Sequence, residues 1–314
     1  MTDDDTSKIE IPTMGASVGG RCGFVALIGA PNAGKSTLLN SLVGSKIAIV
    51  THKVQTTRSR LVGVAIHEDA QMIFVDTPGI FAPRKRLERA MVAAAWEGAN
   101  DADVIVFMVD ATRKIEDSTR IIAEGLKDSS KKAILVLNKI DLVKRDTLLA
   151  KTQELNELGE FEETLMISAT TGNGLDVLRD KIAENLPEGP WLYPEDHLTD
   201  ISERMLASEI TREKFFLRFH EELPYATTIE TERWKDLKDG SVRIEQVIYV
   251  ERDSQKMIVI GKGGKGLKTI GTQAREELEE LLERIVHLFI FVKVRKGWSD
   301  DKERYRNMGL DWVK

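Results

Sequence analysis

The stretch GAPNAGKST, from Gly29 to Thr37, decides the fold of the N-terminal half of the chain. Residues 29–36 fit the pattern G-x-x-x-x-G-K-[ST], after the apolar run FVALIG (24–29) and before the helical pattern STLLNSLVG. In this context the glycines let backbone N–H groups close around phosphate oxygens, and the start of the helix adds positive potential. We therefore expect Lys35 to reach the β- and γ-phosphates of a nucleotide and Ser36 to hold Mg²⁺.

Further apolar, strand-like runs alternate with helical patterns along the same half of the chain. They are QMIFVD (71–76), DVIVFMVD (103–110), KAILVLNK (132–139) and TLMIS (164–168). Near-continuous apolar strands separated by helices are typical of a mostly parallel sheet that helices cover on both faces. The sequence thus predicts an α/β P-loop domain over residues 21–186, after a flexible tail of residues 1–20.

A second motif, DTPG (76–79), stands at the C-terminal end of a predicted strand. Ligands of open α/β sheets bind at that end. Asp76 is expected to bind Mg²⁺ through water, and the Gly79 N–H is expected to face the γ-phosphate. The next residue is Ile80, where Ras-type enzymes carry a glutamine that orients water. Isoleucine cannot do this, so we expect slow intrinsic hydrolysis.

A third motif, NKID (138–141), follows another predicted strand. Asp141 can accept hydrogen bonds from N1–H and the N2 amino group of guanine, which adenine does not offer together, so it selects GTP over ATP. Alone, the motif could equally be a helix-capping turn, but its order after the first two motifs favours a guanine site. SAT (168–170) completes the set, with backbone N–H groups expected to reach guanine O6.

The order of these motifs resembles the GTPases of the Ras-like superclass, and the variants P-N-A-G-K-S, Q-T-T-R (55–58) and N-K-I-D resemble its translation-factor-related bacterial group. The resemblance places the first switch at Gln55–Arg58 and implies that Thr57, rather than Thr56, binds Mg²⁺ and the γ-phosphate. It implies an Mg²⁺-dependent GTPase that forms GDP and phosphate. The metal ligands would be Ser36, Thr57 and Asp76, and the catalytic residues Lys35, Thr57 and Gly79. The residues expected to bind GTP are Gly29, Pro31, Asn32, Ala33, Gly34, Lys35, Ser36, Thr37, Asp76, Thr77, Pro78, Gly79, Asn138, Lys139, Asp141, Ser168, Ala169 and Thr170.

Asn32, inside the phosphate loop, stands where similar GTPases place a ligand for a monovalent cation. The resemblance therefore raises K⁺ as an activating ion. The alternative, that Asn32 only braces the loop, stays equally open at this point.

A second glycine-lysine loop, VIGKGGKGLKTIG, spans residues 259–271. It is not a second phosphate loop, because Gly264-Lys265 is followed by Gly266 instead of Ser or Thr. Gly261–Gly264 fits G-x-x-G, which we read as lying between an apolar strand, IVI (258–260), and an amphipathic helix. This pattern resembles the KH module, whose loop clamps the backbone of about four single-stranded nucleotides. The expected RNA-binding residues are Gly261, Lys262, Gly263, Gly264, Lys265, Lys268 and Arg275, with Lys293, Arg295 and Lys296 extending the basic patch.

The order of elements after residue 199 predicts a small α+β domain. A helix is expected near 200–219, with Asp200 as its cap, followed by strands near 226–234 and 242–251, the glycine loop, a helix and a strand at 287–294. The order is α-β-β-α-α-β if a short helix closes the glycine loop, and its helix-first start implies the type II KH topology over residues 200–298. LPEGPWLYPEDHL carries three prolines and predicts a linker at 187–199, and residues 299–314 form a C-terminal tail without an expected function.

Composition limits the remaining classes of function. The net charge of −6 is uneven, since residues 201–314 carry 22 basic against 21 acidic side chains. The single cysteine, Cys22, forms no disulfide framework and favours a reducing cytoplasm, and the five histidines show no zinc spacing. The apolar runs are too short to span a bilayer. We expect a monomer.

A GTPase domain joined to a C-terminal KH domain resembles the Era family of bacterial GTPases from about Gly23 to Trp298. The resemblance implies binding to small-subunit (16S) ribosomal RNA near its 3′ end during maturation of the 30S subunit, and some peripheral membrane association. Two other functions compete with this one. A membrane or cell-division signalling GTPase would use the C-terminal domain to bind protein, and an RNA-modifying enzyme would need a catalytic cysteine, metal site or cofactor motif that the sequence does not offer.

Overall fold

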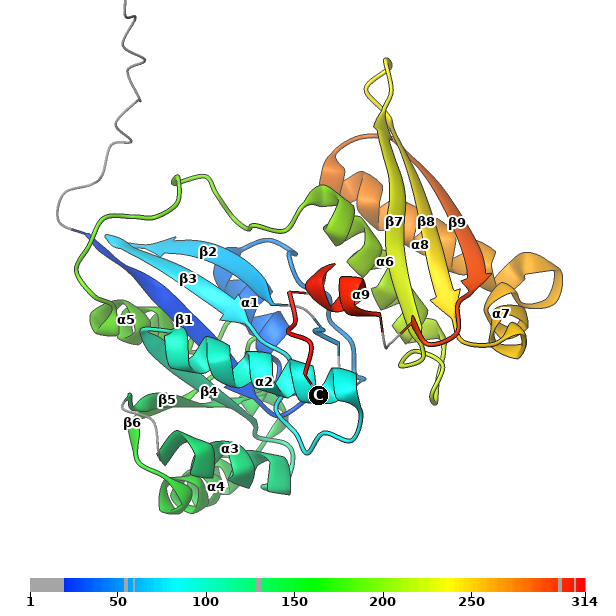
Figure 1. Cartoon of the computed structure of the whole chain (residues 1–314). Helices are drawn as coiled ribbons and strands as arrows, with labels where there is room; N and C mark the ends of the chain where they lie inside the picture. The colour runs from blue at the N-terminus through cyan, green and yellow to red at the C-terminus, as the bar shows by residue number, and fades with distance from the viewer. Residues whose placement is uncertain are drawn as a thin grey trace, which may run out of the picture.

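The structure is a computed structural model that describes residues 20–53, 56–58, 60–127, 131–298, 301–307 and 309–313. The expected N-terminal tail, apart from residue 20, lies outside the described residues, and so does Gln55 of the first switch. The described chain forms two units that lie side by side, an N-terminal one around a large sheet and a C-terminal one around a small sheet (Figure 1).

The N-terminal domain alternates strands and helices along the chain. Its elements are β1 (Arg21–Gly29), α1 (Lys35–Val43), β2 (Leu61–His67), β3 (Ala70–Asp76), α2 (Arg86–Asp101), β4 (Val104–Asp110), α3 (Asp117–Lys127), β5 (Ala133–Asn138), the 3₁₀ turn η1 (Ile140–Leu142), α4 (Arg145–Leu158), β6 (Phe161–Met166) and α5 (Leu175–Asn185).

The six strands form one sheet in the order β2-β3-β1-β4-β5-β6, parallel except for the antiparallel pair β2–β3. Helices α1 and α5 bury their apolar residues on one face, and α2, α3 and α4 bury theirs on the other. The predicted α/β fold is confirmed. The sequence reading missed β2 at the sheet edge. Only a two-residue turn separates its sequence, LVGVAIH, from β3, so the two strands are hard to tell apart in the sequence.

The predicted linker follows the edge of the N-terminal sheet. The buried side chain of Gln71 in β3 accepts hydrogen bonds from the N–H groups of Leu192 and Tyr193 at 2.8 and 3.0 Å. Farther along, the Val64 N–H donates to Leu198 O at 2.8 Å and the Thr199 hydroxyl to Val62 O at 2.6 Å. The segment is thus hydrogen-bonded to β2 and β3 before it enters the second domain.

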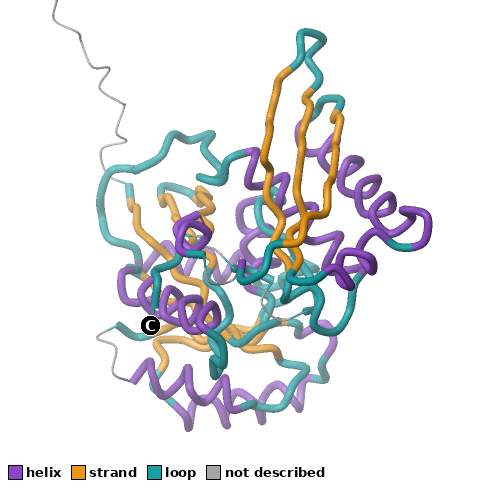
Figure 2. Tube along the Cα trace, turned by 45° about the vertical axis from the view of Figure 1, so that its right-hand side comes forward, coloured by secondary structure: helices purple, strands orange, loops and turns teal. Residues whose placement is uncertain are grey.

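The C-terminal domain packs three helices against one face of a three-stranded sheet of order β7-β8-β9, in which β8 and β9 are parallel. Figure 2 shows the strands running together away from the rest of the molecule, with the β7–β8 turn at the tip. The elements are α6 (Glu203–Arg218), β7 (Thr227–Asp236), β8 (Val242–Val250), α7 (Asp253–Ile260), the 3₁₀ turn η2 (Lys262–Gly264), α8 (Lys265–Leu282) and β9 (Val286–Val294). The order α-β-β-α-α-β is the predicted one.

Two local predictions in this domain were wrong. Residues 258–260 are the last turn of α7 and not a strand, because the side chain of Gln255 accepts the Glu251 and Arg252 N–H groups and closes the first helical turn. Asp200 does not cap α6. The cap is Ser202, whose hydroxyl accepts the Met205 N–H at 3.3 Å.

The C-terminal segment returns to the first domain. A short helix, α9 (Lys302–Asn307), lies between the two units (Figure 1). The buried side chains of Trp298, Tyr305 and Leu310 form one apolar cluster with Leu87 and Met91 of α2. The segment without an expected function therefore joins the KH-like domain to the helix that follows the DTPG motif. Within the described part of the chain, no helix is both long and apolar enough to cross a membrane.

Candidate functional site

The phosphate loop connects β1 to α1 and needs its glycines for space as well as for conformation. Gly34 has φ 100°, and a Cβ there would lie 2.2 Å from the side-chain nitrogen of Asn138. A Cβ at Gly29 would lie 2.5 Å from the carbonyl oxygen of Met108. The backbone therefore passes too close to the neighbouring strands for any other residue.

Lys35 begins α1 with its ammonium group folded back into the loop. It donates to the carbonyl oxygens of Gly29 and Ala30 at 3.2 and 3.3 Å, and the residue is only 6% exposed. Burial lowers the pKa of Lys35 to about 8, although the charge of Asp76 opposes this shift. A lysine so desolvated gains strongly from an anionic phosphate brought into the loop.

Three side chains bring oxygen atoms together beside Lys35. The Ser36 hydroxyl donates to Asp76 Oδ2 at 2.8 Å, the Thr57 hydroxyl donates to the same oxygen at 3.1 Å, and the two hydroxyls are 3.0 Å apart. Burial raises the pKa of Asp76 despite Lys35 and the two hydroxyls, and its other oxygen, Oδ1, is buried with no hydrogen-bond partner among the described residues. An unsatisfied carboxylate oxygen beside two hydroxyls suits a hard cation such as Mg²⁺. The structure thus brings together Ser36, Thr57 and Asp76.

The DTPG segment packs directly on the phosphate loop. A Cβ at Gly79 would lie 2.8 Å from the backbone nitrogen of Pro31, and the Ile80 N–H donates to Gly29 O at 3.1 Å. The Thr77 hydroxyl donates to Leu27 O at 2.9 Å. Ile80 is fully buried in the core between the sheet and its helices, so it presents no polar group to the nucleotide site.

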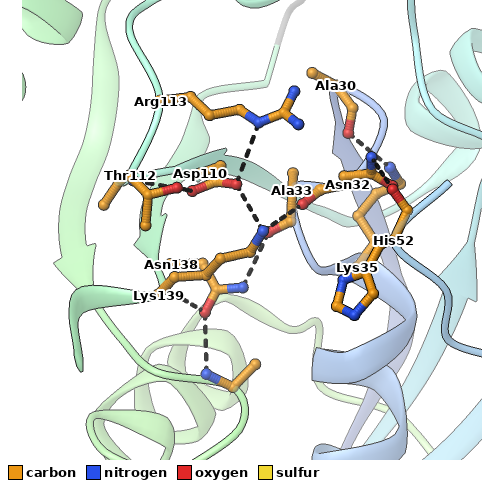
Figure 3. Close-up of polar contacts among 12 residues, drawn as sticks. Ala30, Asn32, Ala33, Lys35, His52, Asp110, Thr112, Arg113, Asn138 and Lys139 are labelled. Atoms are coloured by element: carbon orange, nitrogen blue, oxygen red, sulfur yellow. Dashed lines mark hydrogen bonds and ion pairs between the residues drawn. The ribbon is translucent and has the colours of Figure 1, made fainter. Parts of the chain in front are cut away.

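Asn138 and Lys139 brace the loop from the end of β5 (Figure 3). The Asn138 amide donates to Ala33 O at 2.9 Å, and the Lys139 ammonium donates to Asn32 O at 2.8 Å and to Asp110 Oδ2 at 2.6 Å. Burial alone would raise the pKa of Asp110, but hydrogen bonds from Lys139 and Thr112 outweigh it and lower that pKa. The sequence reading missed Asp110, and its position at the end of an apolar strand was the available signal.

The residues expected to bind guanine divide into exposed ones and ones whose backbone N–H groups are already hydrogen-bonded. Asp141 in η1 and Thr170 are exposed at the loop ends. The Ser168 N–H donates to Asn173 O at 2.9 Å, and the Ala169 N–H donates to Asn138 Oδ1 at 3.0 Å. The Ser168 N–H therefore closes its own loop, which leaves the N–H groups of Ala169 and Thr170 as the ones expected to reach guanine O6.

Asn32 acts as a brace in this structure. It has φ 65°, and its side-chain nitrogen donates to His52 O at 2.9 Å (Figure 3). This hydrogen bond uses only the nitrogen of the amide and leaves the amide oxygen as a possible cation ligand. A bracing role and a cation-ligand role are thus compatible in one side chain.

The second glycine loop joins α7 to α8 on the far side of the C-terminal domain from the nucleotide residues (Figure 1). Gly261, Gly263 and Gly264 all have positive φ, at 71°, 61° and 74°. The side chains of Lys262, Lys265 and Lys268 are exposed along this loop and the first turn of α8.

The basic patch beyond the loop is smaller than its residue list suggests. Arg275 is bound to Glu279 at 2.6 Å, Lys293 to Glu232 at 2.9 Å and Arg295 to Asp301 at 2.6 Å. These acids lie outside the loop sequence 259–271 on which the basic patch was predicted. Positive charge available to a polyanion is therefore concentrated at the loop.

A groove of about 440 Å³ runs from the glycine loop between α8 and the edge strand β9. It is lined by Gly264, Leu267, Lys268, Gly271, Thr272, Arg275, Leu288, Phe289, Ile290 and Phe291. Phe289 and Phe291 are 42% and 50% exposed, and the sequence reading missed them as candidate binding residues. The available signal was HLFIFVKV, which has apolar residues at both odd and even positions of an edge strand.

Two known families match separate parts of the chain. Residues 24–139 match the family described as 50S ribosome-binding GTPase, and residues 222–299 match the KH domain. The GTPase Era of Sinorhizobium medicae (strain WSM419) is 60% identical over 310 residues, covering 99% of this chain and 98% of that protein. The GTPase Era of Brucella suis biovar 1 (strain 1330) is 59% identical over 292 residues, covering 93% and 94%.

Two solved structures resemble the whole molecule at 41% identity, each covering 92% of this chain and 99% of the other. One is a variant of Aquifex aeolicus Era, with one tyrosine replaced by alanine, bound to GDP·AlF₄⁻, and its TM-score is 0.87. The other is Era in complex with MgGDPNP and nucleotides 1506–1542 of 16S ribosomal RNA, with a TM-score of 0.88.

Proposed function

The chain belongs to the Era family of GTPases, and from this premise we propose that it uses GTP hydrolysis to switch its binding of small-subunit ribosomal RNA. It is itself a GTPase. The C-terminal domain holds this RNA during maturation of the 30S subunit in the cytoplasm.

In the nucleotide site, Lys35 and the phosphate-loop N–H groups bind the phosphates. Ser36, Thr57 and Asp76 would hold Mg²⁺, which neutralises phosphate charge when bound. Asp141 accepts the guanine N1–H and N2 amino protons, and guanine O6 is met by the Thr170 N–H or by the Ala169 N–H after it leaves Asn138. The contacts of Ser36 and Thr57 with a half-satisfied Asp76 support this assignment.

Hydrolysis by the protein alone is slow, because the buried Ile80 offers nothing to orient water. We assign Asn32 as a ligand for K⁺. The positive charge of this ion near the phosphates would partly make up for the polar side chain that Ile80 replaces. The support for this assignment is the position of the amide in the loop, held through its nitrogen by His52 O.

The observation that carries the RNA assignment is the groove between α8 and β9, which begins at the exposed G-x-x-G loop. The loop offers lysines to phosphates, and the groove offers exposed Phe289 and Phe291 to unstacked bases. A related Era binds nucleotides 1506–1542 of 16S ribosomal RNA together with MgGDPNP, which supports a small-subunit ligand near its 3′ end.

The test is crosslinking of the protein to RNA in cells, followed by sequencing of the bound fragments. Enrichment of the 3′ end of small-subunit ribosomal RNA is expected, and its loss in a variant with aspartates at 262 and 263 would assign the contact to the loop. Filter binding with a single-stranded oligonucleotide separates this function from a membrane or cell-cycle signalling GTPase that binds a protein, since that alternative predicts no retention.

A further inference from the structure

The chain between α1 and β2 leaves the GTPase core and lies against the C-terminal domain. Ile49 is buried in the same apolar cluster as Ala207 and Ile210 of α6. The Val50 N–H donates to Glu213 at 2.9 Å, and the Lys53 ammonium donates to the carbonyl oxygens of Phe216 and Phe219. The segment that leads into the first switch is therefore shaped by α6.

Thr57 is held on both sides by this second domain. Its predecessor, Thr56, accepts a hydrogen bond through its carbonyl oxygen from Arg212 of α6. Its successor, Arg58, donates to Thr227 O at 2.8 Å and to Pro224 O at 3.0 Å. Thr57 itself turns the other way, toward Ser36 and Asp76.

Arg58 is buried although it carries a charge. It is 4% exposed, and its guanidinium lies 5.5 Å from the ring centroid of Phe216 and 5.9 Å from that of Trp298. Burial lowers the pKa of Arg58 to about 9, and the charge of Arg212 adds to the shift. The guanidinium stays protonated at neutral pH. The two carbonyl oxygens and two aromatic rings replace the contacts with water that its charge loses on burial.

We propose that Arg58 is a positioning residue for GTP hydrolysis: anchored in the C-terminal domain, it holds Thr57 where Mg²⁺ and the γ-phosphate bind. The proposal rests on the role assigned to Thr57 above. Consecutive Cα atoms are fixed about 3.8 Å apart, so an anchored Arg58 leaves Thr57 little freedom to move. A displacement of about 1 Å at a positioning contact can cost about 100-fold in rate.

The C-terminal segment belongs to the same anchor. Trp298 forms one wall of the Arg58 site, donates its indole N–H to Ala226 O at 3.0 Å, and is buried among Leu87 and Met91 of α2. The switch before β2 and the helix after DTPG thus meet one residue of the second domain.

The experiment compares R58A, R58K, T57A and the double variant T57A/R58A in the full-length protein. R58A is expected to lower kcat about 10- to 100-fold and to weaken Mg²⁺-dependent binding of a non-hydrolysable GTP analogue, measured by calorimetry, while GDP affinity stays within twofold. R58K keeps the charge but cannot reach both carbonyls, so it should fall between R58A and the parent. T57A/R58A should lose no more activity than T57A, because both changes act through one ligand.

K46M is the matched control, since Lys46 joins Glu213 and Glu277 across the same domain boundary at a distance from Thr57 in the chain. It should leave kcat and the preference for the analogue over GDP unchanged. Thermal unfolding of each variant with GDP bound shows whether it folds. If R58A does not fold, R58K takes its place in the comparison. Additive losses in the double variant, or equal losses for the analogue and GDP, would overturn the role of Arg58. Full activity in T57A would instead overturn the assignment of Thr57.

Discussion

The molecule contains two glycine-lysine loops that differ in what surrounds them. In the phosphate loop, Lys35 is 6% exposed, and Asn138 and Lys139 brace the backbone from another strand. In the loop at Gly261–Gly264, the lysines are exposed and a Cβ at Gly263 would meet nothing within 4 Å. Contacts within the protein preorganise the first loop without a ligand, whereas the second loop exposes its positive charge to solvent.

The difference follows from the size of the ligands. A nucleotide phosphate is small enough to be enclosed, so a buried lysine with a depressed pKa can be reserved for it. An RNA backbone is a polymer that runs past the protein, so it needs open access and exposed positive charge. Similar residue types therefore predict opposite responses to mutation, salt and pH.

The largest expected effect is at Lys35. K35A should lower GTP turnover about 1000-fold, since it removes a buried charge from the developing phosphate charge. S36A should likewise abolish turnover. Steady-state phosphate release measures both, with K132A as a surface-lysine control because Lys132 is 63% exposed. Parental turnover in K35A or S36A would be incompatible with the phosphate-loop assignment.

Base selection should be the next largest effect. D141N exchanges an acceptor for an amide that can donate to the O2 of xanthine, so GDP affinity should fall about 100-fold while xanthosine diphosphate affinity rises. Competition binding with both nucleotides measures this exchange. A variant that keeps GDP affinity and ignores the xanthosine nucleotide would show that Asp141 does not face the base.

The second loop should respond through RNA alone. K262D/G263D should weaken single-stranded RNA binding about tenfold or more and reduce the salt dependence by roughly one counterion per lost phosphate contact. Basal GTP turnover should stay parental, because the chemistry lies in the other domain, while any stimulation by RNA should vanish.

The β7–β8 turn offers a matched control for this variant. K238D/G240D makes the same charge change at an exposed turn where Gly240 also has positive φ, 84°. Full RNA affinity in K262D/G263D would show that this loop does not hold the RNA. An equal loss in the control would show that only the overall charge matters.

The pH dependence should distinguish the buried lysine from the exposed ones. Free protein loses the Lys35 proton as pH rises through about 8, whereas the phosphate-bound lysine keeps it. GDP affinity should therefore be constant below that pH and fall by up to about tenfold per unit above it. Calorimetry from pH 7 to 9 tests this, with K35M as control. If GDP affinity falls with pH equally in both proteins, a group other than Lys35 causes the pH dependence.

The smallest expected effect is ionic. If Asn32 binds K⁺, turnover should be several-fold faster in potassium than in sodium, and N32A should remove the difference. Phosphate release in matched chloride salts measures the ratio. Equal rates in the two salts would leave Asn32 as the brace that its bond to His52 already makes it.

The motif order and both fold classes could be predicted from sequence because each depends on local patterns. G-x-x-x-x-G-K-S, DTPG and NKID each follow an apolar strand, and strands of a parallel sheet deliver their C-terminal ends to one edge. The helix at residues 258–260 could not be predicted this way, because a three-residue apolar run has no period and Gln255 decided the outcome.

The sequence by itself determined that the chain has two ligand loops, which chemistry each suits, and that Ile80 cannot orient water. Only the tertiary structure decided which groups are free to act, because pairing partners come from distant segments. Glu232 of β7 binds Lys293 of β9, Asn138 of β5 holds the backbone of Ala33, and the C-terminal domain encloses Arg58. Local patterns specify elements, but long-range contacts specify which charges and hydrogen bonds remain for a ligand.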